Sequence, residues 1–337
     1  ETYYNIKNEK YFYIELKNRF GSAKNPKIKL INMRGDKEKI ISKSTLQILN
    51  EKISKNKQVL ILINRRGYAP LTLCSSCGYG IKCNNCDIKL VFHKKKDKLI
   101  CHHCGLEQGL ISVCSNCKKK GTIISIGFGI EKVTEEVQNY FNNEKIVSLS
   151  SDTFKNKTFA KILKDIEEGS IKIIIGTQIV SKGFNFQKLD SVFVLDFDMW
   201  SNNADIRTNE KIFQLAQQVS GRTSRGDKTG EVFIQTYDLD NPLLKYLIDY
   251  KRNEFYNNEL ILRKNANLPP YTKLIAILLT SKNIQNIQNT SMKIKKLLGL
   301  LKEIKVFGPT PAPIEYIKNE YRYRILIKTN HPQLVQS

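Results

Sequence analysis

Short, continuous runs of apolar residues recur along the first two thirds of the chain. Residues 58–64 read QVLILIN, which is typical of a strand buried on both faces of a parallel sheet. Each such run is predicted to be a strand. Similar runs follow at Ile123–Ile126, Lys145–Leu149, Ile171–Ile175, Ser191–Leu195 and Glu231–Gln235.

Stretches with helical periodicity separate these runs, at Glu131–Phe141, Phe159–Glu168 and Glu210–Val219. Strands that alternate with helices of about ten residues indicate right-handed βαβ units. The pattern therefore predicts an α/β fold with an open parallel sheet.

The C-terminal third has a different pattern of apolar and polar residues. A long helical pattern covers about Leu243–Lys264, and Pro269 and Pro270 prevent it from continuing. Beyond it we expect two strands, Lys273–Thr280 and Tyr323–Lys328, and one helix, Ile284–Ile304. These elements predict a small α+β C-terminal domain.

All eight cysteines fall within residues 73–120, where they interrupt the α/β pattern, so this range is predicted to be an inserted module. Zinc prefers four tetrahedral thiolates, and one C-x-x-C turn supplies two of them. Four such pairs predict two structural Zn²⁺ sites with no position open to a substrate. The pairs are Cys74 and Cys77, Cys83 and Cys86, Cys101 and Cys104, and Cys114 and Cys117.

The spacing of the pairs suggests how they combine. Fourteen residues separate Cys86 from Cys101, close to the zinc-ribbon interval, and they read as a hairpin with a lysine-rich tip. We therefore expect a nested arrangement, with a cross-braced one as the alternative. The inner site would hold Cys83, Cys86, Cys101 and Cys104, and the outer site Cys74, Cys77, Cys114 and Cys117. His93, His102 and His103 are expected to be bystanders, because the cysteine set is complete.

The chain is strongly basic, with 55 Lys and Arg against 32 Asp and Glu and a formal net charge of +23. The electrostatic field of such a charge attracts nucleic acid, although lysine is frequent throughout the sequence and solubility is the alternative explanation for the charge.

No apolar run approaches the roughly 20 residues of a membrane-spanning helix. We expect no membrane contact and a cytoplasmic location. Since the chain starts at Glu1, we also expect a fragment.

Three polar clusters lie where predicted strands or helices end, and sheets of this class bind ligands at their strand ends. The first is NRRGY at 64–68, the second GTQ at 176–178 with SKG at 181–183, and the third QVSGRTSR at 218–225. Each alone is equally explained by turn chemistry or by a helix end. Together they resemble motifs V and VI of superfamily 2 helicases, which lie on the second of two RecA-like lobes.

This resemblance implies roles for individual residues. Arg225 would be the arginine finger that stabilises negative charge on the γ-phosphate, with Arg222 and Gln218 beside it at the nucleotide. The implied nucleotide- and DNA-contacting residues of the other motif are Gly176, Thr177, Gln178, Lys182 and Gly183. Asp196 and Asp198 receive no magnesium role, because the chain has no G-x-x-x-x-G-K-[ST] loop.

With an eight-cysteine insert directly after NRRGYAP, the motifs resemble the PriA family of primosomal replication-restart helicases. Ser224 departs from the glycine usual in that family. Further similar segments are ETY at 1–3, GIEKVTEEV at 129–137, ADIRTNEKIFQL at 204–215, LPPY at 268–271, GPTPAP at 308–313 and RYR at 322–324.

The resemblance implies an ATP-dependent 3′-to-5′ DNA helicase that starts primosome assembly at stalled forks. ATP and Mg²⁺ would be cofactors of the full-length protein, and this chain alone, without the Walker lobe, should be inactive. Implied partners are forked and single-stranded DNA, other primosome proteins, the replicative helicase loader and the single-stranded DNA-binding protein. The alternative is a non-enzymatic zinc-ribbon nucleic-acid-binding protein. A RecG-like helicase is disfavoured by the cysteine insert.

The expected domain organisation follows from these patterns. Residues 1–40 would connect from lobe 1, and helicase lobe 2 would comprise 41–72 and 121–237. The zinc module would be 73–120, and 238–337 would be a C-terminal DNA-binding domain. There, Arg322 and Arg324 are candidate DNA contacts, for which a solvated strand face is an equally good interpretation.

Overall fold

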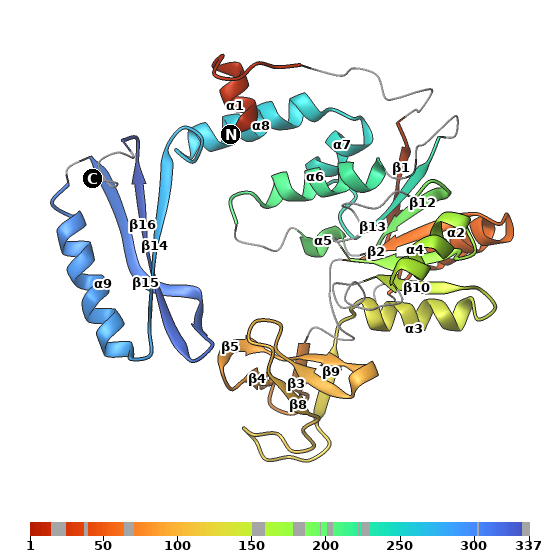
Figure 1. Ribbon diagram of the computed structural model, residues 1–337, viewed down its shortest axis with the longest axis horizontal. Helices are drawn as coiled ribbons and strands as arrows, with labels where there is room; N and C mark the ends of the chain where they lie inside the picture. The colour runs from red at the N-terminus through yellow and green to blue at the C-terminus, as the bar shows by residue number, and fades with distance from the viewer. Residues whose placement is uncertain are drawn as a thin grey trace.

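The computed structural model describes three units along one chain (Figure 1): an α/β lobe, a cysteine-containing module and a C-terminal α+β unit. In Figure 1 the module lies below the lobe and the C-terminal unit lies to the left. The described residues are 1–14, 25–36, 40–63, 71–149, 159–177, 186–195, 197–200, 205–221, 223, 229–301 and 303–331.

Within these residues the lobe is built on a six-stranded sheet whose strands are all parallel. The central strand β2 is buried at all five positions, as the continuous apolar run predicted. The strand order is β1 (Lys27–Asn32), β13 (Glu231–Thr236), β12 (Leu189–Val194), β2 (Gln58–Leu62), β11 (Ile173–Gly176) and β10 (Ile146–Leu149).

Helices cover both faces of this sheet, because alternate residues of each strand point to opposite sides. Val59 and Ile61 pack in one apolar cluster with α2 (Lys43–Ser54) and α3 (Ile130–Tyr140). Leu60 and Leu62 pack in the other. The helices on that second face are α4 (Phe159–Glu168), α6 (Thr208–Ser220), α7 (Pro242–Ile248) and α8 (Arg252–Asn265), and the short α5 (Phe197–Trp200) follows β12.

Polar side chains fix where several helices begin. Ser42 precedes α2 and accepts a hydrogen bond from the Thr45 N–H, and Asn241 does the same for the Leu243 N–H ahead of α7. Such caps satisfy backbone donors that have no partner within the helix.

Two segments of the lobe differ from the expectation. Residues 1–40 were expected to be a polar connecting segment with an extended run near Lys29–Asn32 and no helical period. The extended run is the edge strand β1, whereas the helix α1 (Thr2–Lys7) was not expected. Ile123–Ile126 is a strand, as predicted, but not of the parallel sheet. As β9 it pairs antiparallel with β3 (Leu71–Cys74). Its Ile124 and Ile126 are 42% and 43% exposed, so an apolar composition alone did not reveal which sheet it joins.

The inserted module consists of very short strands around a small core. The predicted hairpin is confirmed: Val91 lies opposite Ile100 and His93 opposite Lys98, with the lysine-rich tip between them. The elements are β4 (Lys82–Cys83), β5 (Cys86–Lys89), β6 (Val91–His93), the 3₁₀ turn η1 (Lys94–Lys96), β7 (Lys98–Ile100) and β8 (Glu107–Gly109).

The C-terminal unit is an antiparallel sheet covered by one helix, in agreement with the predicted α+β domain. Its elements are β14 (Lys273–Ser281), α9 (Ile284–Leu298), β15 (Ile304–Ile317) and β16 (Glu320–Thr329). At the far end of β15, a bridge to β5 joins this sheet to the module, so that the strand order is β14-β16-β15-β5-β4.

Three predictions in this part were wrong. The single helix over 243–264 is two helices, because Tyr250 takes a left-handed conformation (φ 55°) between them. The helix predicted to reach Ile304 ends at Leu298, ahead of Gly299. Strand β15 was missed because its prolines argue against a strand. They are accommodated where the ladder with β16 breaks register, between Phe307 and Tyr316.

None of the helices in the described part of the chain combines the length and the apolar character needed to cross a bilayer.

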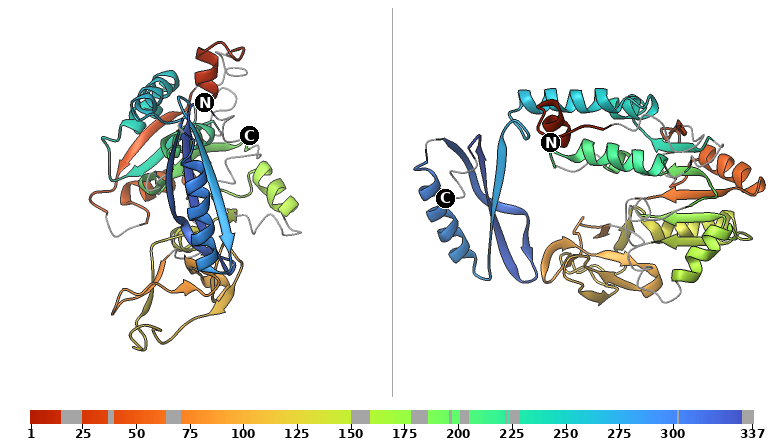
Figure 2. Two further views of the ribbon diagram at one scale, coloured as in Figure 1. Left: turned by 90° about the vertical axis from the view of Figure 1, so that its left-hand side faces the viewer. Right: turned by 45° about the horizontal axis from the view of Figure 1, so that its top comes forward.

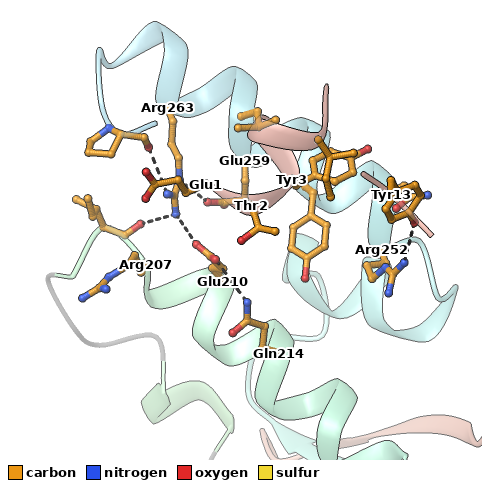
Figure 3. Close-up of a pocket in the computed structure, with 16 residues that line it drawn as sticks. Glu1, Thr2, Tyr3, Tyr13, Arg207, Glu210, Gln214, Arg252, Glu259 and Arg263 are labelled. Carbon is orange, nitrogen blue, oxygen red and sulfur yellow. Dashed lines mark hydrogen bonds and ion pairs between the residues drawn. The ribbon is translucent and has the colours of Figure 1, made fainter. Parts of the chain in front are cut away.

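A buried arginine joins α8 to α6 and to the segment that leads into the C-terminal unit. Arg263 on α8 is 9% exposed, and its guanidinium lies 3.0 Å from a carboxylate oxygen of Glu210 on α6 and 3.6 Å from one of Glu259. It also donates to the carbonyls of Ile206 (3.2 Å) and Pro269 (3.3 Å). These groups line a cavity of about 480 Å³ between α1, α6 and α8 (Figure 3). The red α1 lies against α8 in both views of Figure 2.

Replacing Arg263 with alanine should lower the free energy of unfolding by about 3 kcal/mol, because partly buried carboxylates and carbonyls would lose their partner. Arg207 is a matched control: its side chain is 61% exposed and pairs with Asp205, so Arg207→Ala should change the free energy by no more than about 0.5 kcal/mol. Urea unfolding followed by circular dichroism measures both. Equal midpoints for the two variants would contradict the structural role of Arg263.

Candidate metal centres

The outer cysteine cluster lies at the base of the module, where β3 enters it and β9 leaves. Its four Sγ atoms lie within 4.8 Å of one another. The Sγ atoms of Cys74 and Cys117 are 3.7 Å apart, as are those of Cys77 and Cys114. Each C-x-x-C pair curls into a turn closed by a backbone hydrogen bond, from Gly78 to Cys74 and from Lys118 to Cys114.

The inner cluster is more deeply buried. Cys83, Cys86 and Cys101 are buried and Cys104 is half-buried. Their Sγ atoms also lie within 4.8 Å of one another, and those of Cys83 and Cys104 are 3.5 Å apart.

Both clusters fit tetrahedral zinc. A Zn–S bond of about 2.3 Å implies Sγ–Sγ separations of about 3.8 Å, close to the observed distances. The structure groups the cysteines in the nested arrangement and not in the cross-braced one. Four thiolates complete the coordination of zinc, so zinc in either cluster would stabilise the fold and leave no position for a substrate.

The surroundings shift the pKa values of individual thiols in opposite directions. A hydrogen bond with Thr122, whose Oγ1 lies 3.1 Å from Cys74 Sγ, lowers the pKa of the Cys74 thiol to about 6. Burial raises the pKa of Cys83 in the inner cluster to about 12. Since a metal binds the thiolate, metal binding would release protons here and contribute directly to folding.

The histidines lie outside both clusters. His93 Nδ1 is 2.7 Å from Glu131 Oε1 on α3, and His93 Nε2 is 3.1 Å from His102 Nε2. Beside them Lys94 forms an ion pair with Glu135 on the next turn of α3, at 2.6 Å. His93 therefore attaches the module to the lobe. The spacing of two glutamates on one helix face is the one feature of the sequence that accompanies this contact.

The predicted nucleotide-motif residues are only partly within the described residues. Gly176 ends β11, directly beside Leu62 of β2. The buried Thr177 follows it and donates its N–H to the Leu149 carbonyl at 3.3 Å. Both thus lie at the carboxyl edge of the sheet, while Gln218 is exposed in the last turn of α6. Gln178, Lys182, Gly183, Arg222, Ser224 and Arg225 lie outside the described residues.

Asp198 has a structural role. Its carboxylate accepts hydrogen bonds from the Thr236 hydroxyl and from the Tyr237 N–H. It therefore links α5 to the end of β13, whereas Asp196 lies outside the described residues.

Together, a RecA-like parallel sheet, two inserted four-cysteine clusters and a C-terminal α+β unit define a helicase lobe with a zinc module. The helicase conserved C-terminal domain matches residues 100–227. The PriA DNA helicase Cys-rich region (CRR) domain matches residues 83–108, and the primosomal protein N C-terminal domain matches residues 264–337. The family that these matches show is that of PriA, and the chain matches its C-terminal half.

Relatives in several bacteria carry the name replication restart protein PriA. The protein of Rickettsia felis is 38% identical over 331 residues, covering 97% of this chain and 51% of the relative. That of Bacillus subtilis is 31% identical over 335 residues, covering 97% and 42%. The chain thus spans about half the length of the curated relatives it matches. Among solved structures, RecG bound to a three-way DNA junction has a TM-score of 0.38 at 10% identity, covering 70% of this chain and 22% of that one.

The zinc content of cysteine variants tests which cysteines share a metal site. The unmodified chain should hold two zinc ions. Replacing the four outer cysteines with serine should leave one, because the inner four form a complete site by themselves. Atomic emission measurements on purified protein, with the inner four replaced as the matched control, report the content. Complete zinc loss from the outer variant would contradict the nested grouping, since it requires that each site uses cysteines of both sets, as in a cross-braced arrangement.

Replacing His93 with alanine should leave two zinc ions per chain, because His93 contacts Glu131 and His102. The loss of these hydrogen bonds should still lower stability by about 1–2 kcal/mol. The exposed His103 is the control, and His103→Ala should change neither zinc content nor the midpoint of thermal unfolding. Loss of a zinc ion from His93→Ala would show that His93 is a ligand.

Proposed function

We propose that this chain supplies the second helicase lobe, the zinc module and the C-terminal domain of an ATP-dependent 3′-to-5′ DNA helicase that restarts replication at stalled forks. The observation that carries the proposal is the match of 97% of the chain to the C-terminal half of a replication restart protein. Separate family models match residues of the zinc module, of the lobe and of the C-terminal unit, which supports the proposal.

In this proposal the lobe completes an ATP site whose phosphate cradle lies on another lobe. ATP would be held there with Mg²⁺, and Arg225, with Arg222 and Gln218 beside it, would approach the γ-phosphate. An arginine stabilises the charge that develops during phosphoryl transfer. Lys182 would pair with a phosphate, and Gln178 and Gly183 would complete the same loop. The position of Gly176 and Thr177 at the carboxyl edge supports this, because open α/β sheets bind ligands there.

The C-terminal unit would bind forked and single-stranded DNA through the open face of its sheet. Tyr323 is buried, and its hydroxyl accepts a hydrogen bond from Gln288 of α9 at 2.9 Å. Since strand residues alternate between faces, Arg322 and Arg324 point away from α9, and Arg324 is exposed. A helicase of this kind would work in the cytoplasm with other primosome proteins, the replicative helicase loader and the single-stranded DNA-binding protein.

The test compares this chain with a protein extended to include its natural upstream sequence. Only the extended protein should hydrolyse ATP in the presence of forked DNA, and Arg225→Ala should reduce the rate by about 10³-fold or more. Arg34→Ala, at an exposed arginine after β1, is the matched control and should retain activity. An extended protein that binds DNA but shows no nucleotide hydrolysis would favour a zinc-ribbon nucleic-acid-binding protein instead.

A further inference from the structure

The tip of the β15–β16 hairpin meets the inner cysteine cluster. Ile317 and Glu320 are paired across a two-residue turn formed by Lys318 and Asn319. Ile317 also pairs with Cys86, so that β5 and β4 extend the C-terminal sheet into the module. Figure 1 shows this tip beside β5, and the second view in Figure 2 agrees.

The turn presents two backbone donors to the module. Lys318 and Asn319 both have positive φ, 52° and 65°, as in the tight turns that match the twist of a hairpin. The N–H groups of such a turn point outward and need a partner elsewhere. The Asn319 N–H donates to the Asn85 carbonyl at 3.1 Å, and the Lys318 N–H donates to Cys86 Sγ at 3.4 Å.

An apolar contact accompanies these hydrogen bonds. The Ile317 side chain packs against the module core that contains Cys83, Cys86, Leu90 and Leu99. The outer cluster, by contrast, receives side-chain contacts from within the module, where Asn116 Nδ2 lies 3.6 Å from Cys77 Sγ and Thr122 contacts Cys74. The C-terminal hairpin is therefore joined to the inner site.

The shape of the turn that contains Cys83 and Cys86 decides whether this contact can form. The Asn85 carbonyl, the Cys86 sulfur and the Cys86 backbone that meet the hairpin tip all belong to this turn. A metal bound by both cysteines would hold the turn in the shape on which Ile317 packs.

We propose that the inner cysteine site is the docking point of the C-terminal domain: metal at this site holds the β15–β16 tip on the module, and metal at the outer site does not. By linkage, docking must strengthen metal binding by the same factor by which metal strengthens docking. Loss of the inner metal would leave the contacts at the other end of the C-terminal domain, where Lys273 of β14 pairs with Glu1 and Arg263 of α8 donates to the Pro269 carbonyl.

Hydrogen exchange at the two turn amides tests the first half of the proposal on the zinc-loaded chain. Replacing the four inner cysteines with serine should raise exchange at Lys318 and Asn319 by about tenfold or more, the loss expected for about 1.4 kcal/mol of docking. Replacing the four outer cysteines should leave both amides protected. Ile325 and Ile327, buried in β16, report that the C-terminal domain stays folded. Equal exchange of the turn amides in the two variants overturns the proposal.

Zinc affinity tests the reciprocal half without altering a cysteine. In Ile317→Asp, competition with a chelating dye should show the affinity for one of the two zinc ions lowered about tenfold, because docking and metal binding strengthen each other by the same factor. Phe307→Asp is the matched control, because Phe307 is a half-exposed apolar residue toward the other end of the same strand. It should bind both ions with the affinity of the unmodified chain, as should Ile317→Val. Unchanged affinity in Ile317→Asp, or an equal loss in both aspartate variants, refutes the coupling.

Discussion

Metal coordination by two clusters of cysteines, whose sulfur atoms lie within 4.8 Å of one another in each cluster, would hold together a module whose apolar core is very small. The buried core around the inner cluster has six residues, three of them cysteines, and its strands have two to four residues. A core of this size cannot offset the conformational entropy of ordering the chain. Metal binding therefore has to supply the remaining free energy of folding. The contacts of the module with its neighbours accordingly depend on both metal sites.

The positive charge of the chain is less available than its total suggests. At the lysine-rich tip of the module, Lys94 pairs with Glu135, while Lys96 and Lys98 both pair with Glu107. Exposed pairs of this kind add little stability, but two glutamates offset most of the charge of these three lysines. The tip is thus closer to neutral than its sequence indicates, whereas Arg322 and Arg324 of β16 stand on an open sheet face.

The sequence predicted what local patterns control. Continuous apolar runs located the strands of the parallel sheet, and cysteine spacing predicted the nested grouping that the structure shows. The elements that depend on distant partners were missed. Strand β15 carries prolines that its register breaks accommodate, and β9 pairs with β3 instead of joining the parallel sheet. For the contact of His93 with Glu131, the sequence shows only the spacing of two glutamates on α3 and does not indicate their partners. The roles of Arg222 and Arg225 remain predictions from motif resemblance.

The ladder of β3 and β9 has an evolutionary consequence. The chain leaves the lobe at Leu71 and returns at Ile126, which are paired directly opposite each other. Because both ends of the module occupy one place, the geometry of the sheet is independent of how many residues lie between them. A lineage could therefore lengthen, shorten or exchange this metal-binding segment by insertion at a single loop while the lobe retained its own fold.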